Sequence, residues 1–178
     1  MCYTDAATLP DNLTSGTSQA GLGVFIINTD ENPPISIFVK ALLQESSSVL
    51  MAESTALALA TDLLNQIQCT RYTIFNQHLV HFLNQSNLSN PPDWRIKPYS
   101  KSAANLLAIY STQVRRIKRT QNQMADSLAR QAFQAITSNQ IQYDFSCSNP
   151  SHANNCPFLR AINSVTIISV NVLSALCC

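Results

Sequence analysis

Charged residues are scarce in this chain: they make up 12% of its 178 residues, and the formal net charge is only +1. So small a net charge points to no class of partner by itself. The scarcity does make the position of every acidic residue informative. The length predicts one domain with a substantial core, residues 1–137, followed by a C-terminal tail of unknown structure, residues 138–178.

Targeting signals are absent as well. The N-terminus has no basic region followed by an apolar run, so we expect no signal peptide and a nuclear or cytoplasmic location. The apolar run from Ile162 to Cys178 contains two Asn and three Ser residues and is too short to span a bilayer, so we expect no membrane association. The chain opens directly on a strand-like segment, which is typical of a domain cut from a larger polypeptide.

Paired cysteine motifs are missing too. Cys147 and Cys156, with His152 between them, resemble part of a metal knuckle. Three ligands are fewer than a closed structural zinc site uses, so we expect no metal there. Cysteines scattered without a CxxC pair are typical of reduced thiols. The six are Cys2, Cys69, Cys147, Cys156, Cys177 and Cys178.

Acidic residues are absent between Trp94 and Ala125, although most of the basic residues lie there. This segregation of charge is typical of a phosphate-facing surface, and a merely solvated basic face explains it equally well. Seven of the eleven basic residues belong to the stretch: Arg95, Lys97, Lys101, Arg115, Arg116, Lys118 and Arg119.

The hydrophobic pattern predicts a meander of three strands, then a helix, a strand, two helical segments, a strand and a last helix. β-branched and aromatic runs mark the strands, and apolar residues at helical spacing mark the helices. Thr120-x-x-Gln123 resembles a capping box at the start of the last helix. Strands that alternate with helices after a meander imply an α/β fold, with a mixed sheet covered by helices. The expected strands are 1–7, 20–27, 35–43, 71–75 and 114–119; the expected helices are 47–67, 76–83, 100–111 and a last one reaching 136.

Three acidic residues lie in the first strand and near the starts of two helices. Asp5 lies in the first strand, Glu53 in the first turns of the first long helix, and Asp126 near the start of the last helix. Each acid alone is explained by helix-start electrostatics or by a strand-end cap. Together they lie where these elements should converge on one edge of the sheet. Carboxylates gathered there would raise one another's pKa unless a cation neutralises them, and Mg²⁺ prefers such ligands.

This ordered set resembles type 1 ribonuclease H. The motifs that carry the resemblance are Asp5 in a leading strand, Ala52-Glu53 at a helix start, and Asn122-x-x-Ala125-Asp126. The chain is more specifically similar to plant domains of this family that derive from non-LTR retrotransposons. The resemblance covers roughly residues 1–137, including Gly21-x-Gly23. It implies a mixed five-stranded sheet, made of an antiparallel three-strand meander and two further strands, flanked by helices.

The resemblance also implies an activity, namely endonucleolytic hydrolysis of the RNA strand of an RNA–DNA hybrid. Asp5, Glu53 and Asp126 carry over as catalytic metal ligands for two Mg²⁺ (or Mn²⁺) ions, which such sites hold about 4 Å apart. Contacts to RNA 2′-hydroxyls would give the preference for a hybrid. We expect a monomer that was once fused to an upstream reverse transcriptase. The expected nucleic-acid-binding residues are Arg115, Arg116, Lys118, Arg119 and Asn122.

The sequence departs from the family pattern at one metal-binding position. Depending on a local gap, Phe75 or Asn76 stands where the family has its remaining Asp, and no acid occurs between Asp62 and Asp93. Asn76 offers a neutral carbonyl oxygen at this degenerate position, without the charge that holds a hydrated ion. Many relatives also carry a His before the last helix. None occurs between residues 119 and 126, and we expect His78 and His81 to be core or surface residues.

Three functions remain open from the sequence. The first is a ribonuclease H weakened by the missing Asp. The second is a catalytically inactive, nucleic-acid-binding relic of a retroelement. The third is a structural or interaction domain, or a decaying retroelement fragment with no present function.

Overall fold

The computed structural model describes residues 1–8, 18–30, 32–69, 72–76, 94, 97–98, 101, 113–152, 155–160, 162 and 166–174. The helical segments expected at 76–83 and 100–111 fall almost entirely outside these residues, as do His78 and His81. Among the helices that are described, none is long and apolar enough to cross a bilayer.

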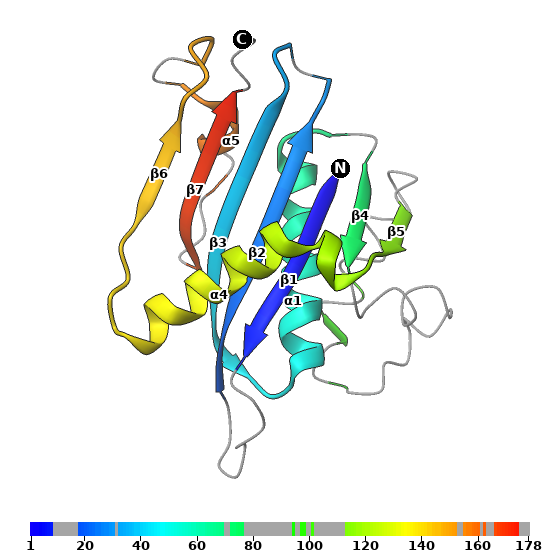
Figure 1. Ribbon diagram of the computed structural model, residues 1–178, viewed down its shortest axis with the longest axis vertical. Helices are drawn as coiled ribbons and strands as arrows, with labels where there is room; N and C mark the ends of the chain where they lie inside the picture. The colour runs from blue at the N-terminus through cyan, green and yellow to red at the C-terminus, as the bar shows by residue number, and fades with distance from the viewer. Residues whose placement is uncertain are drawn as a thin grey trace.

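The strands in the described part of the chain form one mixed sheet in the order β5–β4–β1–β2–β3–β7–β6 (Figure 1). β1, β2 and β3 are the antiparallel meander, and β4 and β5 continue the sheet in parallel beyond β1. This part confirms the α/β fold expected from the sequence. The strands are β1 (Cys2–Thr8), β2 (Ser18–Asn28), β3 (Ile35–Ser46), β4 (Thr73–Asn76), β5 (Gln113–Arg116), β6 (Asp144–Cys147) and β7 (Ile167–Ser174).

The expected strand count of five is wrong, because the C-terminal segment adds two strands to the sheet. β7 pairs antiparallel with β3, and β6 pairs parallel with β7. Val170 and Val172 of β7 are fully buried, so the segment contributes to the core. The β-branched run near the C-terminus is therefore a strand that covers the edge β3 would otherwise expose.

Helices cover both faces of the sheet. α1 (Val49–Gln66) lies behind the sheet in Figure 1, and α4 (Gln123–Thr137) crosses in front of it. The short α5 (Pro157–Arg160) lies on the α1 side, where its Phe158 joins the main core. Ser48 caps α1 by accepting a hydrogen bond from the Met51 N–H.

Two glycines let α4 lie directly on β2. A Cβ atom on Gly21 would come within 2.1 Å of the Ala129 carbonyl oxygen, and one on Gly23 within 2.2 Å of the Ala125 carbonyl oxygen. Neither position has room for a side chain. Gly23 pairs with Asp5 across the β1–β2 ladder. The close approach therefore brings the first turn of α4, which carries Asp126, beside Asp5.

Candidate metal and nucleic-acid site

The candidate site lies where β1, β4 and the N-terminal parts of α1 and α4 meet. Asp5 comes from the centre of β1, Glu53 from the second turn of α1, and Asn76 is the last residue of β4. Asp126 comes from the first turn of α4, as the sequence predicted. Glu53 and Asn76 are almost completely buried, and Asp5 is only 5% exposed.

Asn76 occupies the degenerate position and contacts Glu53. Its side-chain Nδ2 donates hydrogen bonds to Glu53 Oε2 at 3.1 Å and to Thr4 Oγ1 at 3.0 Å. Phe75, the other residue that the sequence left open for this position, instead stacks its ring on Tyr3, with centroids 4.9 Å apart. A neutral amide group therefore faces the buried glutamate.

The last helix begins after Asn122, because Arg119–Gln121 first form a 3₁₀ turn. The expected capping box at Thr120 is therefore wrong.

Asn122 contacts Asp5 much as Asn76 contacts Glu53. Asn122 Nδ2 donates to the Thr4 carbonyl at 2.9 Å and to Asp5 Oδ2 at 3.2 Å. The side chain is buried, and its Oδ1 has no hydrogen-bond partner among the described residues.

Asp126 is held toward solvent by two arginines. Its carboxylate lies 2.8 Å from Arg130 Nε, one helical turn further along α4, and 3.5 Å from Arg119. Its side chain is 27% exposed. Within the described part of the chain, the oxygens of Asp5, Glu53 and Asp126 do not all come within 4.8 Å of one another. Asp5 and Glu53 nevertheless lie close enough for their charges to repel, and Asp126 interacts with Asp5 more weakly.

Burial and neighbouring charge perturb Asp5. The pKa of its carboxyl group is raised to about 7, first because the group is buried and next because the Glu53 carboxylate repels its charge. Asp126 adds a smaller repulsion, and the hydrogen bond from the Ala6 N–H, at 2.9 Å, acts in the opposite direction. The site thus concentrates negative charge that it compensates only in part.

The expected nucleic-acid-binding residues lie along the neighbouring edge of the sheet. Arg115 and Arg116 are exposed on β5, and Arg116 pairs in register with Asn76 of β4. Lys118 and Arg119 are exposed just beyond that strand. Asn122 does not join this surface, because its side chain is buried against β1.

A hollow of about 440 Å³ opens beside Asp126, between the end of β1 and α4. Arg119, Arg130 and Phe133 line it, together with Ala6 and Ala7. The two arginines that line the hollow are the ones that pair with Asp126.

Solved structures of ribonuclease H domains share this arrangement of elements. The ribonuclease H1 of Halobacterium salinarum NRC-1 is 18% identical, over 75% of this chain and 96% of that one, with a TM-score of 0.56. LC11-RNase H1, isolated from compost and solved in complex with an RNA/DNA hybrid, is 19% identical over 76% and 97%, with a TM-score of 0.57. This chain has a ribonuclease H-like fold.

The same fold occurs as part of a larger viral protein. The prototype foamy virus protease–reverse transcriptase is 17% identical over 74% of this chain and 20% of that one, with a TM-score of 0.56. No protein-family model and no curated protein matches the chain.

A ribonuclease H-like fold implies divalent cations at the carboxylate edge, and the donors present fit one such ion. Asp5 and Glu53 repel each other, and a cation between them would relieve that repulsion. The unpartnered Oδ1 of Asn122 adds a neutral oxygen donor. A second ion fits less well. It would find an amide at Asn76, and it would compete with two arginines for Asp126.

Two residues of the site escaped the sequence interpretation. Thr4 accepts hydrogen bonds from both Asn76 and Asn122, through its hydroxyl and its carbonyl oxygen. No pattern in the sequence marked it. Arg130 could have been found, because it follows Asp126 by four residues, a spacing that brings opposite charges together on a helix.

Proposed function

We propose that this chain binds RNA–DNA hybrids and hydrolyses the RNA strand weakly, with one divalent cation, Mg²⁺ or Mn²⁺, at Asp5 and Glu53. The observation that carries the proposal is the buried contact between Asn76 and Glu53. It keeps the glutamate in the site and leaves a neutral group where the ribonuclease H pattern has an aspartate. Such a site holds the cation with fewer negatively charged ligands, so we expect hydrolysis to be slower than with the full set of carboxylates.

The chain's own residues hold the reacting groups in place. Asn122 fixes the orientation of Asp5 through Nδ2, and Asn76 fixes that of Glu53. Arg115 and Arg116 offer positive charge to the phosphates of the substrate along β5. A cation bound at the acids would polarise the scissile phosphate and activate a water molecule for the displacement.

A specific observation also favours the inactive relic as a second candidate. Each of the three acids already has a donor from the protein: Asp5 has Asn122, Glu53 has Asn76, and Asp126 has two arginines. Acids that are compensated in this way can remain folded without any metal. The chain would then keep the basic surface and bind nucleic acid without turnover.

Hybrid cleavage by the purified chain separates the two candidates. We expect slow cleavage of the labelled RNA strand with Mg²⁺ or Mn²⁺, none in EDTA, and none for Asp5→Asn, whereas hybrid binding persists in all three cases. Binding without cleavage at any cation concentration would support the relic. Equal cleavage by wild type and Asp5→Asn would contradict the proposed site, and no binding at low salt would contradict both candidates.

We also infer that the chain derives from a plant non-LTR retrotransposon and acts in the nucleus or cytoplasm. The ordered acid motifs support this origin, and the occurrence of the same fold within the protease–reverse transcriptase of a foamy virus supports a retroelement source in general. The genomic sequence upstream of the coding region tests it. Remnants of a reverse transcriptase there would agree with the proposal, and an unrelated upstream domain in the same reading frame would contradict it.

A further inference from the structure

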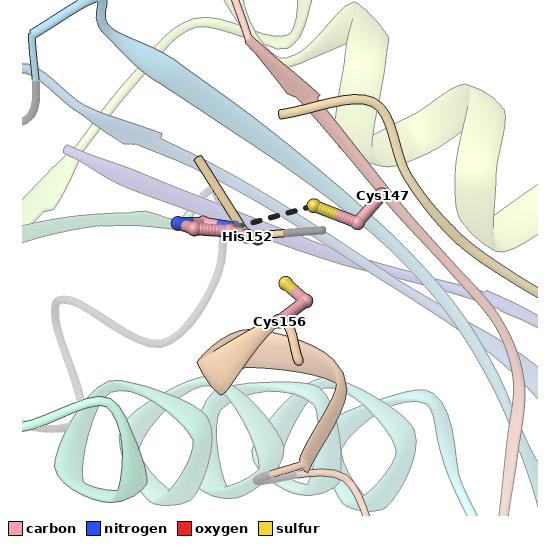
Figure 2. A group of neighbouring side chains, drawn as sticks. All are labelled: Cys147, His152 and Cys156. Carbon is pink, nitrogen blue, oxygen red and sulfur yellow. Dashed lines mark hydrogen bonds between the residues drawn. The ribbon is translucent and has the colours of Figure 1, made fainter. Parts of the chain in front are cut away.

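We propose that Cys147, His152 and Cys156 bind a Zn²⁺ ion that cross-links two parts of the C-terminal segment, the end of β6 and the start of α5. These three side chains lie outside the carboxylate site and take no part in the proposed hydrolysis. Within the described part of the chain, they form the one group of three His, Cys, Asp or Glu side chains whose ligand atoms all lie within 4.8 Å of one another. Figure 2 shows the two sulfur atoms and the near edge of the imidazole ring facing a common space.

The distances suit a tetrahedral ion. Cys147 Sγ lies 3.3 Å from His152 Nδ1. Ligands at typical Zn–S and Zn–N bond lengths of about 2.3 and 2.0–2.1 Å are separated by roughly 3.5–3.8 Å along the edges of a tetrahedron. Small movements of the side chains would therefore admit the ion. Two sulfurs and one imidazole nitrogen form a soft donor set, which favours Zn²⁺ over the Mg²⁺ expected at the acids.

Neighbouring residues orient the histidine. His152 Nε2 lies 3.3 Å from the side-chain nitrogen of the buried Asn149, and the side-chain oxygen of Asn149 accepts a hydrogen bond from the Ser151 N–H at 2.9 Å. The imidazole ring also packs against Phe158, with centroids 5.7 Å apart. The packing holds the ring in place. A metal on Nδ1 would leave the proton on Nε2, so the Asn149 amide would turn its oxygen, in place of its nitrogen, toward the ring.

Two of the ligands adjoin β6 and α5, and His152 lies in the turn between them. Cys147 ends β6 and pairs in register with Val172 of β7. Cys156 directly precedes α5, whose Phe158 is buried in the core against α1 and the sheet. An ion here would clamp the outer edge of the sheet to α5. Three protein ligands leave a fourth position for water, as in open zinc sites.

The experiment uses the full chain, reduced and stripped of metal with a chelator, and titrates it with Co²⁺ as a spectroscopic substitute for Zn²⁺. We expect sulfur-to-cobalt charge-transfer bands that saturate at one ion per chain and disappear when Zn²⁺ displaces Co²⁺. Cys147→Ser and His152→Gln should each weaken binding more than about 10-fold. Zn²⁺ should also raise the melting temperature of the wild type, since it binds the folded state.

Matched variants keep the proposal falsifiable. Cys69→Ser removes a thiol elsewhere and should leave the bands unchanged, and so should Asp5→Asn at the carboxylate site. If Cys147→Ser does not fold, His152→Gln tests the same prediction. Bands that persist in both ligand variants, or that never form, would overturn the proposal. So would a Cys147–Cys156 disulfide found by mass spectrometry in a chain that takes up no metal after reduction.

Discussion

Asn76 and Asn122 partly compensate the negative charge of the carboxylate site. Both amides donate to buried acids, and together they reach Glu53, Asp5 and the neighbouring Thr4. An amide donor compensates a carboxylate only in part, because it carries no net charge. Burial, and next the residual repulsion from Glu53, raise the pKa of Asp5.

Asp5 should make the stability of the cation-free chain depend on pH. The pKa of its carboxyl group rises from an ordinary 3.8 to about 7 on folding, so the unfolded chain releases this proton at lower pH than the folded chain. The free energy of unfolding should therefore fall as the pH rises from about 4 to about 7. At about 1.4 kcal/mol per pKa unit, the loss is at most roughly 4 kcal/mol.

Denaturant unfolding in EDTA across this pH range measures the effect. Asp5→Asn should remove most of the slope and make the chain more stable than wild type near pH 7.5. Asp30→Asn, an exposed change in the turn after β2, is the control. If the free energy of unfolding depends on pH equally in wild type and Asp5→Asn, burial of the Asp5 carboxylate does not destabilise the chain.

At the scale of elements, the contact between β2 and α4 sets the position of Asp126. Gly23→Ala would place a Cβ atom 2.2 Å from the Ala125 carbonyl oxygen and 2.6 Å from the Ala129 nitrogen, so α4 must move as a unit. Overpacking of this kind costs roughly 1–3 kcal/mol, and contact with backbone atoms favours the upper end. Denaturant unfolding checks this cost. Gln19→Ala, an exposed change on the same strand, should stay within about 0.5 kcal/mol of wild type.

The C-terminal elements offer a second test, with two phenylalanines in different surroundings. Phe158 of α5 is 5% exposed and belongs to the main core, whereas Phe145 of β6 is 47% exposed. Phe158→Ala should destabilise the chain by about 3–5 kcal/mol, and Phe145→Ala by much less. Thermal and denaturant unfolding compare the two variants. Similar losses would mean that the segment after residue 138 does not pack on the core.

The first strands, α1 and α4 could be predicted because their patterns are regular. β-branched and aromatic runs mark β2 and β3, and the stripe through Ala125, Leu128 and Ala132 marks the buried face of α4. β6 carried no such pattern, since its residues face solvent. Whether 1–137 and 138–178 are separate units, as the sequence predicted, stays a prediction.

The acids of the site could be found from their places at a strand and at two helix starts, but their contacts could not. Nothing in the sequence shows that Asn76 turns its amide toward Glu53, or that Asn122 is buried rather than exposed. The sequence argued against a metal at Cys147, His152 and Cys156, because three ligands are fewer than a closed zinc site uses. Folding brings those three side chains together, and their spacing along the chain does not give the distances between them in the fold.

At the scale of the whole molecule, the described basic residues are most concentrated along β5 and the turn that follows. Replacing both Arg115 and Arg116 by Ala should weaken hybrid binding, and for every phosphate that is no longer neutralised the salt-dependence slope of the affinity should fall by about one. Fluorescence anisotropy at several salt concentrations measures both quantities. Arg160→Ala, an exposed change on α5, is the control for loss of charge alone. An unchanged slope for the double variant would place the nucleic acid on another surface.

The most direct test of the whole account is hybrid cleavage by Asn76→Asp with Mg²⁺ or Mn²⁺. The substitution restores the fourth carboxylate beside Glu53, so we expect single-turnover cleavage at least about 10-fold faster than wild type, which corresponds to roughly 1.4 kcal/mol of barrier. Adding Asp5→Asn should abolish the gain. No gain from Asn76→Asp, in a variant that folds and binds the hybrid as wild type does, would contradict the claim that this position limits the site.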